Sequence, residues 1–156
     1  MTTIVCYDPH GLPVPVAADA LVFSQAAYGI FVENNEILLL QNAQTGWLTW
    51  PGAVLQVGER PYQVVSRTYH LLTGIVPVVG PLVFMEDVYQ VDGDGRARHI
   101  PAMFYWLERP PATSFSLTAI DANYTPQMLP VDYVQRSHLQ FGYQALQAGL
   151  RRLNTA

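Results

Sequence analysis

Lysine is absent from the sequence, and cysteine occurs once, at Cys6. All eight basic residues are therefore arginine, and they are dispersed among twelve acidic residues, which leaves a formal net charge of −4. Dispersed arginines form no basic stripe, so we expect no nucleic-acid partner, because binding to a nucleic-acid backbone needs clustered positive charge. A lone cysteine excludes an internal disulfide and a cysteine-based zinc site.

Charged residues are also scarce, at 13% of the chain, against roughly 25% in an average soluble domain. Half of the residues are hydrophobic, which excludes a disordered tail. No apolar run approaches the ~20 residues of a membrane span, and the N-terminus lacks the pattern of a signal peptide. We therefore expect a cytoplasmic protein with no membrane partner, whose surplus apolar surface forms a subunit interface or a pocket.

One domain accounts for residues 1–156, because this length leaves no room for a second domain of ordinary size. Residues 1–20 predict an N-terminal extension with a short strand and a turn. Residues 21–32 predict a long strand. A turn at 33–36, where asparagine tolerates positive φ, joins it in a hairpin to a returning strand over 37–41.

Two helices and a second strand pair complete the pattern. Pro61 at a first-turn position, with Gly74 as the stop, predicts a helix over 61–73. Strands follow at about 76–91, which Pro81 breaks, and at 97–108.

The turn Asp92-Gly93-Asp94-Gly95 joins these two strands. A loop containing Pro126 and Pro130 then leads to a last helix over 136–152. The order strand pair, helix, strand pair, helix predicts a mixed α/β (α+β) fold.

The loop and helix from residue 51 to residue 75 carry a recognisable pattern, Pro51-Gly52-Ala53-x4-Gly58-Glu59-x7-Arg67-x6-Gly74-Ile75. It resembles the box of the Nudix hydrolase family, G-x5-E-x7-R-E-U-x-E-E-x-G-U, where U is a bulky aliphatic residue. Ala53 takes the place of the first glycine, so residues 53–75 form a degenerate Nudix box. The resemblance covers roughly residues 21–152 and implies a Nudix-like mixed β-sheet sandwiched between helices.

The departures from the box concern the metal. In the family, three glutamates bind Mg²⁺ or Mn²⁺, and the ion bridges the diphosphate of the substrate. In this sequence, the same positions are Thr68, Leu71 and Leu72. Gln56 replaces a further acidic residue of the loop. Hard divalent cations need oxygen ligands, and the two leucines offer none. We therefore expect no cofactor, and impaired catalysis.

The remaining box residues have structural roles by the same resemblance. Glu59 and Arg67 are expected to form an ion pair between loop and helix, with a residual metal ligand at Glu59 as the alternative. Gly58 and Gly74 serve the backbone at a turn and at the helix end. We expect Leu71 and Leu72 to pack in the core; the alternative is that they line an apolar pocket where the metal would lie.

A rebuilt acidic site is the alternative to lost activity. Glu59, together with Glu86 or Asp87, would then hold one Mg²⁺ or Mn²⁺ and support hydrolysis of a nucleotide-type diphosphate. His99 lies across the turn from Glu86 and Asp87 and is able to face either. His70 lies on the polar side of the helix, where we expect it to be solvated.

Aromatic side chains are candidates for stacking a flat ligand. The candidates are Trp47, Trp50, Tyr89, Phe104 and Trp106, of which Trp50 and Trp106 are preferred. Arg96, Arg98 and Arg109 are more plausible as solvated surface residues than as contacts to an anionic ligand.

Three functions follow as hypotheses. The first is a non-catalytic module that binds a small, nucleotide-like molecule or a protein partner. The second is a metal-dependent hydrolase with the rebuilt site. The third is an interaction protein, and the low charge content favours a homodimer.

Overall fold

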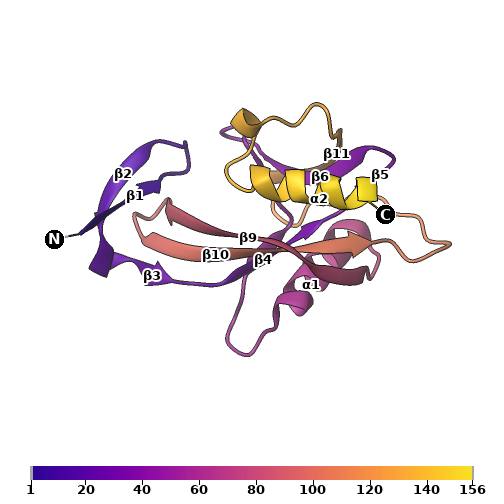
Figure 1. Cartoon of the computed structure of the whole chain (residues 1–156), viewed down its shortest axis with the longest axis horizontal. Coiled ribbons are helices and arrows are strands. Elements are labelled where there is room, and N and C mark those ends of the chain that lie inside the picture. The colour runs from indigo at the N-terminus through magenta and orange to yellow at the C-terminus, as the bar shows by residue number, and fades with distance from the viewer. Residues whose placement is uncertain (1, 156) are drawn as a thin grey trace.

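The computed structural model describes residues 2–155, which form two β-sheets and two α-helices (Figure 1). The larger sheet runs in the order β2-β1-β9-β10-β4-β8, with β3 also paired to β10. Its strands are β1 (Thr3–Tyr7), β2 (Pro13–Ala17), β3 (Val22–Phe23), β4 (Ala26–Ile30), β8 (Gly52–Val54), β9 (Val78–Val91) and β10 (Ala97–Glu108). The smaller sheet contains β5 (Val32–Glu33), β6 (Glu36–Asn42), β7 (Leu48–Thr49) and β11 (Tyr124–Pro130).

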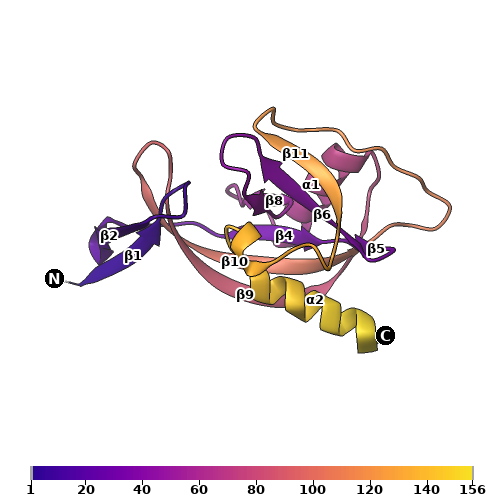
Figure 2. The same cartoon turned by 90° about the horizontal axis from the view of Figure 1, so that it is seen from above.

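The two helices, α1 (Pro61–Thr73) and α2 (Tyr143–Thr155), lie on opposite sides of the long strands β9 and β10 (Figure 2). A buried cluster lies on each side. The small sheet contributes to both, since Ile37 and Leu39 enter one cluster and Leu38 the other, as strand alternation requires. The predicted mixed sheet between helices is therefore confirmed. Among residues 2–155, no helix combines the length and apolar character that crossing a membrane requires.

Helix α1 begins and ends where the sequence predicts. Pro61 occupies the first turn, and the Gln63 side chain accepts the Arg60 backbone N–H at 2.8 Å. Gly74 ends the helix in the left-handed conformation, with φ 76°. The helix is held by its buried face, from Val64 and Val65 to Leu72, because a helix of this length is marginal without tertiary packing.

The predicted strand over 21–32 is instead divided among β3, β4 and β5. Strand β4 pairs with β10 and β8, whereas β5 pairs with β6 in the other sheet. Of these three strands, β5 is the one that forms the hairpin with β6. The predicted turn between them is confirmed by φ angles of 55° and 60° at Asn34 and Asn35.

Proline positions account for two further differences. Strand β9 continues through Pro81, because its register with β10 shifts in this part of the strand and a bulge accommodates the missing N–H donor. Strand β11 contains Pro126 and Pro130, which the sequence places in a loop. It lies at a sheet edge and pairs only with β6, so prolines are tolerated there.

The C-terminal helix begins at Tyr143 rather than at residue 136. Residues Arg136–His138 form a short 3-10 helix, and Gly142 then adopts a φ of 85°, which no α-helix continues through. A Cβ at Gly142 would collide with the Trp50 indole and meet the Phe104 ring at 3.0 Å, so the start of α2 is fixed by close packing as well as by backbone conformation.

We predict that Gly142→Ala destabilises the protein by about 2–4 kcal/mol, because the added methyl group meets Trp50 at a positive φ. The matched control is Gly93→Ala, whose Cβ has open space around it and whose unfolding free energy should change by less than about 0.5 kcal/mol. Urea denaturation of both variants measures the difference. Equal stability of the two would contradict the packing described for Gly142.

Candidate functional site

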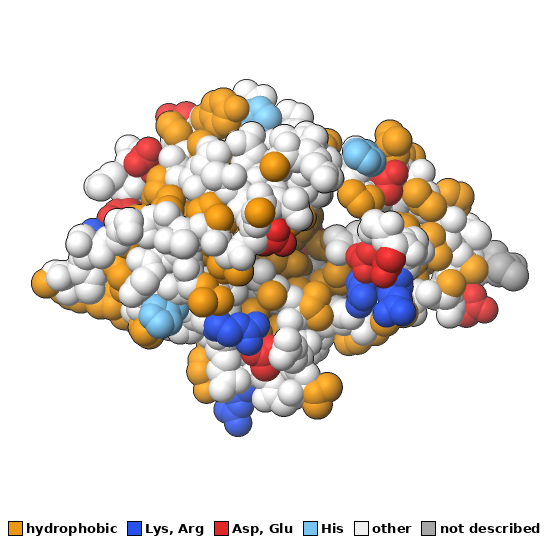
Figure 3. All heavy atoms as spheres, turned by 180° about the vertical axis from the view of Figure 1, so that it is seen from behind, with side chains coloured by type: hydrophobic (Ala, Val, Ile, Leu, Met, Phe, Trp, Pro, Cys, Tyr) orange, Lys and Arg blue, Asp and Glu red, His pale blue; other side chains and the backbone are white. Residues whose placement is uncertain are grey.

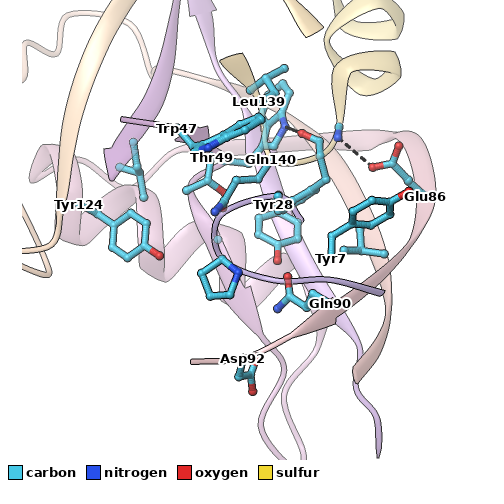
Figure 4. A pocket seen from close by; sticks show the side chains of 18 of the residues that line it. Tyr7, Tyr28, Trp47, Thr49, Glu86, Gln90, Asp92, Tyr124, Leu139 and Gln140 are labelled. Atoms are coloured by element: carbon cyan, nitrogen blue, oxygen red, sulfur yellow. Dashed lines mark hydrogen bonds between the residues drawn. The ribbon is translucent and has the colours of Figure 1, made fainter. Parts of the chain in front are cut away.

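A cleft of about 840 Å³ lies between the N-terminal hairpin, the long strand β9 and the start of α2. Figure 3 shows it as a hollow, with hydrophobic side chains at its floor and acidic side chains on both of its sides. Its lining comes from segments far apart in the sequence, including β1, β4, β7 and β9 and the residues that precede α2 (Figure 4).

The N-terminal hairpin forms one wall of this cleft. Strand β1 pairs with β2 and joins the large sheet beside β9, where Tyr7 is opposite Gln90. The Asp8 carboxylate accepts the backbone N–H groups of His10 and Leu12, each at 2.9 Å, and so fixes the turn. Gly11 in this turn rests on Trp47, where even a Cβ would meet the indole at 3.2 Å. The sequence predicts a strand and turn here, but not their part in the cleft.

Aromatic side chains from four different segments line the cleft. Tyr7, Tyr28, Trp47 and Tyr124 surround its interior in Figure 4. The Tyr28 ring stacks on Phe104, with centroids 5.5 Å apart. Burial, and to a lesser degree Tyr124, raises the pKa of Tyr28, so its hydroxyl keeps its proton at neutral pH and is able to donate a hydrogen bond.

The two preferred stacking candidates are both buried. Trp50 touches the cleft, but it is only 1% exposed and its Nε1 donates to the Phe141 carbonyl at 3.1 Å. Trp106 lies outside the cleft, in the cluster beneath α2, with Nε1 donating to Glu108 at 3.2 Å. A ligand in the cleft would therefore meet Trp47 rather than Trp106. Phe104 is fully buried.

Strand alternation separates the polar side chains of β9 and of the turn that follows it. Glu86, Gln90 and Asp92 lie along the same side of the cleft (Figure 4). Asp87 falls on the opposite face, where its Oδ1 lies 2.8 Å from His99 Nε2. The structure thus selects Asp87 as the carboxylate that His99 faces. His99 also stacks on Tyr89, with centroids 4.6 Å apart.

Glu86 joins β9 to the start of α2. Its Oε2 accepts the Gly142 backbone N–H at 2.8 Å, at the positive end of the helix dipole. Burial raises the pKa of Glu86 above its ordinary value of 4.5, and the Gly142 hydrogen bond and the nearby Arg136 oppose that rise. Glu86 is thus a half-buried carboxyl group at the wall of the cleft.

The ion pair predicted for the box is present. Arg67 Nη1 donates to Glu59 Oε2, and Glu59 Oε1 also accepts the Gln56 N–H at 2.9 Å. Gly58 has a φ of 85° at the turn before them, a conformation that favours glycine. These contacts hold the loop against α1.

The three positions of the metal-binding glutamates offer no carboxylate. Thr68 is buried, and its hydroxyl donates to the Val64 carbonyl at 2.9 Å. Leu72 is 1% exposed within the cluster that includes Phe31, and it also touches the cleft. Leu71 is 54% exposed, so the prediction that it packs in the core is wrong; it does not line the cleft either.

These residues do not fit Mg²⁺ or Mn²⁺, which require several oxygen ligands at ~2.0–2.6 Å. Within residues 2–155, no three His, Cys, Asp or Glu side chains lie close enough together to hold a metal ion. Glu59 does not line the cleft that Glu86 lines, and Asp87 faces His99 instead. Among the described residues, the Glu59 carboxylate therefore does not lie together with that of Glu86 or Asp87 in one acidic cluster.

Two of the three arginine candidates, Arg98 and Arg109, are partly buried and ion-paired rather than solvated as expected. Arg98 pairs with Asp92 at 2.6 Å, and Arg109 pairs with Glu33 at 2.7 Å. Arg96 is exposed beside the hairpin turn, and His70 is exposed on the polar side of α1, as expected for both.

We predict opposite results from introducing a carboxylate at the two leucines of the box. Leu72→Glu should destabilise the protein by about 3–5 kcal/mol, because the charge would enter an apolar cluster without a partner. Leu71→Glu should change the unfolding free energy by less than about 0.5 kcal/mol, since this side chain already faces solvent. Chemical denaturation checks both. A tolerated Leu72→Glu would mean that this position is open to water, as a metal ligand is.

A pH dependence follows from Glu86. A carboxyl group with a raised pKa stabilises the folded state below pH 4.5, and this contribution is lost as pH rises through the folded-state value. Glu86→Gln keeps a hydrogen-bond acceptor for Gly142 but cannot ionise. We predict that the unfolding free energy of Glu86→Gln, relative to the unmodified protein, increases between pH 4.5 and pH 7 in urea titrations. A constant difference would contradict the raised pKa.

No protein-family model and no curated protein matches the sequence. Solved structures do match the fold. The MutT protein of Methanosarcina mazei Go1 has a TM-score of 0.64 at 16% identity, over 87% of this chain and 98% of that one. The MutT Nudix hydrolase of Burkholderia pseudomallei has a TM-score of 0.62 at 15% identity, over 80% and 95%.

The Nudix domain of Shewanella oneidensis NrtR, solved in complex with ADP-ribose, has a TM-score of 0.57 at 17% identity. It covers 86% of this chain and 89% of that one. Identities this low establish a common architecture and leave the chemistry of each site to its own residues. This chain therefore has the fold of the Nudix hydrolases.

Proposed function

We propose that this chain is a catalytically impaired Nudix-fold module that binds a small molecule in its cleft without a divalent cation. One observation carries the proposal: the face of α1 that would hold the metal presents Thr68 and Leu72, whereas the cleft beside it is still formed. A metal in this fold neutralises phosphate charge and activates water. Removing three carboxylates from one centre removes most of the charge that would retain the ion.

The cleft itself supports ligand binding. Its volume of about 840 Å³ is within the range of small-molecule sites, which combine apolar walls with a few polar groups. Tyr28 and Trp47 offer aromatic faces, and Thr49, Gln90 and Gln140 offer hydrogen-bonding groups. A similar structure contains ADP-ribose, so a flat, nucleotide-like ring is a reasonable type of ligand by analogy.

We predict that the purified protein does not hydrolyse ADP-ribose when Mg²⁺ or Mn²⁺ is supplied at millimolar concentration. A ligand found by thermal-shift screening should raise the melting temperature equally in EDTA and in Mg²⁺, because no ion takes part in its binding. Product analysis by chromatography and paired thermal scans measure the two effects. Turnover that EDTA abolishes, and that Glu59→Gln removes, would overturn the proposal in favour of a rebuilt metal site.

A homodimer stays a prediction for this chain. Several large apolar side chains are exposed, including Phe23 at 62%, Met85 at 55% and Val78 at 52%. Light scattering at low micromolar concentration distinguishes a dimer from a monomer.

A further inference from the structure

We propose that the cleft selects organic cations, that is, a flat ring bearing a protonated amine or a quaternary ammonium group. This inference rests on the proposed function, because it names the class of ligand that the same cleft binds. It combines three features of the described residues: the charge of the lining, its aromatic faces, and an available carboxylate oxygen at Glu86.

The first feature is the charge of the lining. Among the described residues that form the cleft, one is basic, the exposed Arg136. The acidic side chains on the cleft side are Asp8, Glu86, Asp92 and Asp121; Asp87 also borders the cleft, but its carboxylate faces His99 on the other face of β9. Even when Arg98, the ion-pair partner of Asp92, is included, carboxylates on the cleft side outnumber guanidinium groups four to two.

This balance disfavours an anionic ligand. A diphosphate brings at least two further negative charges, and like charges repel each other more strongly in a cleft with low-dielectric walls than in open water. The box offers no metal site that would offset this repulsion, since Thr68 and Leu72 provide no ionised oxygen. A cation is attracted by the same field.

The second feature is the aromatic lining. Tyr and Trp rings attract a cation placed over their faces, and they also stack on a flat ring. Tyr7, Tyr28, Trp47 and Tyr124 come from different segments and border one interior space (Figure 4). Tyr7 is 53% exposed and Trp47 is half-buried, so both keep surface that a ligand is able to cover.

The third feature is Glu86. Its Oε2 is occupied by the Gly142 N–H, and within residues 2–155 its Oε1 has no hydrogen-bond partner. Arg136 acts on Glu86 at longer range, but the Arg136 guanidinium lies over the Tyr143 ring, 4.8 Å from the centroid. Glu86 Oε1 is therefore free to accept a hydrogen bond from an ammonium group in the cleft.

Three indoles that differ in charge test the inference: tryptamine is a cation, tryptophol is neutral and indole-3-acetate is an anion at pH 7. Isothermal titration calorimetry in EDTA and low salt should give the tightest binding for tryptamine, about tenfold tighter than for tryptophol, and the weakest for indole-3-acetate. Added salt should reduce the advantage of tryptamine, because it screens the carboxylates. Tetramethylammonium is included as a cation without a ring.

Glu86→Gln is the diagnostic variant, since it keeps the acceptor for Gly142 and removes the charge. Its affinity for tryptamine should fall about tenfold while its affinity for tryptophol stays unchanged. The matched control is Glu36→Gln, which removes one carboxylate outside the cleft and should leave both affinities as they are. Circular dichroism verifies that both variants are folded.

The outcomes separate this inference from the proposed function. Tighter binding of indole-3-acetate than of tryptamine overturns the cation preference. Binding of ADP-ribose in EDTA, without binding of either cation, overturns it as well. In both cases the proposal of a metal-independent binding module survives. The absence of binding by both cations, the neutral indole and ADP-ribose counts against both claims. A tryptamine advantage that Glu86→Gln leaves intact contradicts the role of Glu86.

Discussion

The apolar face of α1 is the constraint on which the rest of the structure depends. Leu72 and Thr68 are buried on that face, and the Thr68 hydroxyl donates a hydrogen bond to the Val64 carbonyl. The helix is therefore held to the sheets by two of the three positions that would present glutamates to a metal, since Leu71 faces solvent. Packing and metal binding compete for this face, because a carboxylate introduced at Leu72 would lose its solvation. The fold keeps its box as a structural element through the Glu59–Arg67 ion pair.

The walls of the cleft come largely from elements other than α1, although Leu72 of that face borders it. The N-terminal hairpin rests on Trp47, and Glu86 fixes the start of α2 through Gly142. Under the proposed metal-independent binding, the carboxylates of the cleft have no dication to offset them, which gives the cleft a negative character. A concave aromatic site that carries negative charge is suited to cations, so the proposed cation preference follows from the same physical argument as the proposed absence of a metal.

Local signals explain what the sequence predicts correctly. Pro61 and Gly74 bound α1, and the Asp92–Gly95 turn sets the β9–β10 hairpin, because each depends on a few adjacent residues. Strand β11 is missed because its pairing with β6 is a tertiary contact that compensates for its prolines. The preference for Trp106 over Trp47 as a stacking residue is wrong for the same reason: α2 covers Trp106, whereas the N-terminal hairpin leaves part of Trp47 open to the cleft.

Titration with Mn²⁺, followed by electron paramagnetic resonance, tests the central claim most directly, because it detects the ion without assuming a substrate. The account predicts that the protein leaves the signal of free Mn²⁺ unchanged up to millimolar concentration. Stoichiometric binding of one ion per chain at micromolar Mn²⁺, lost on substitution of Glu59 by Gln, would contradict it.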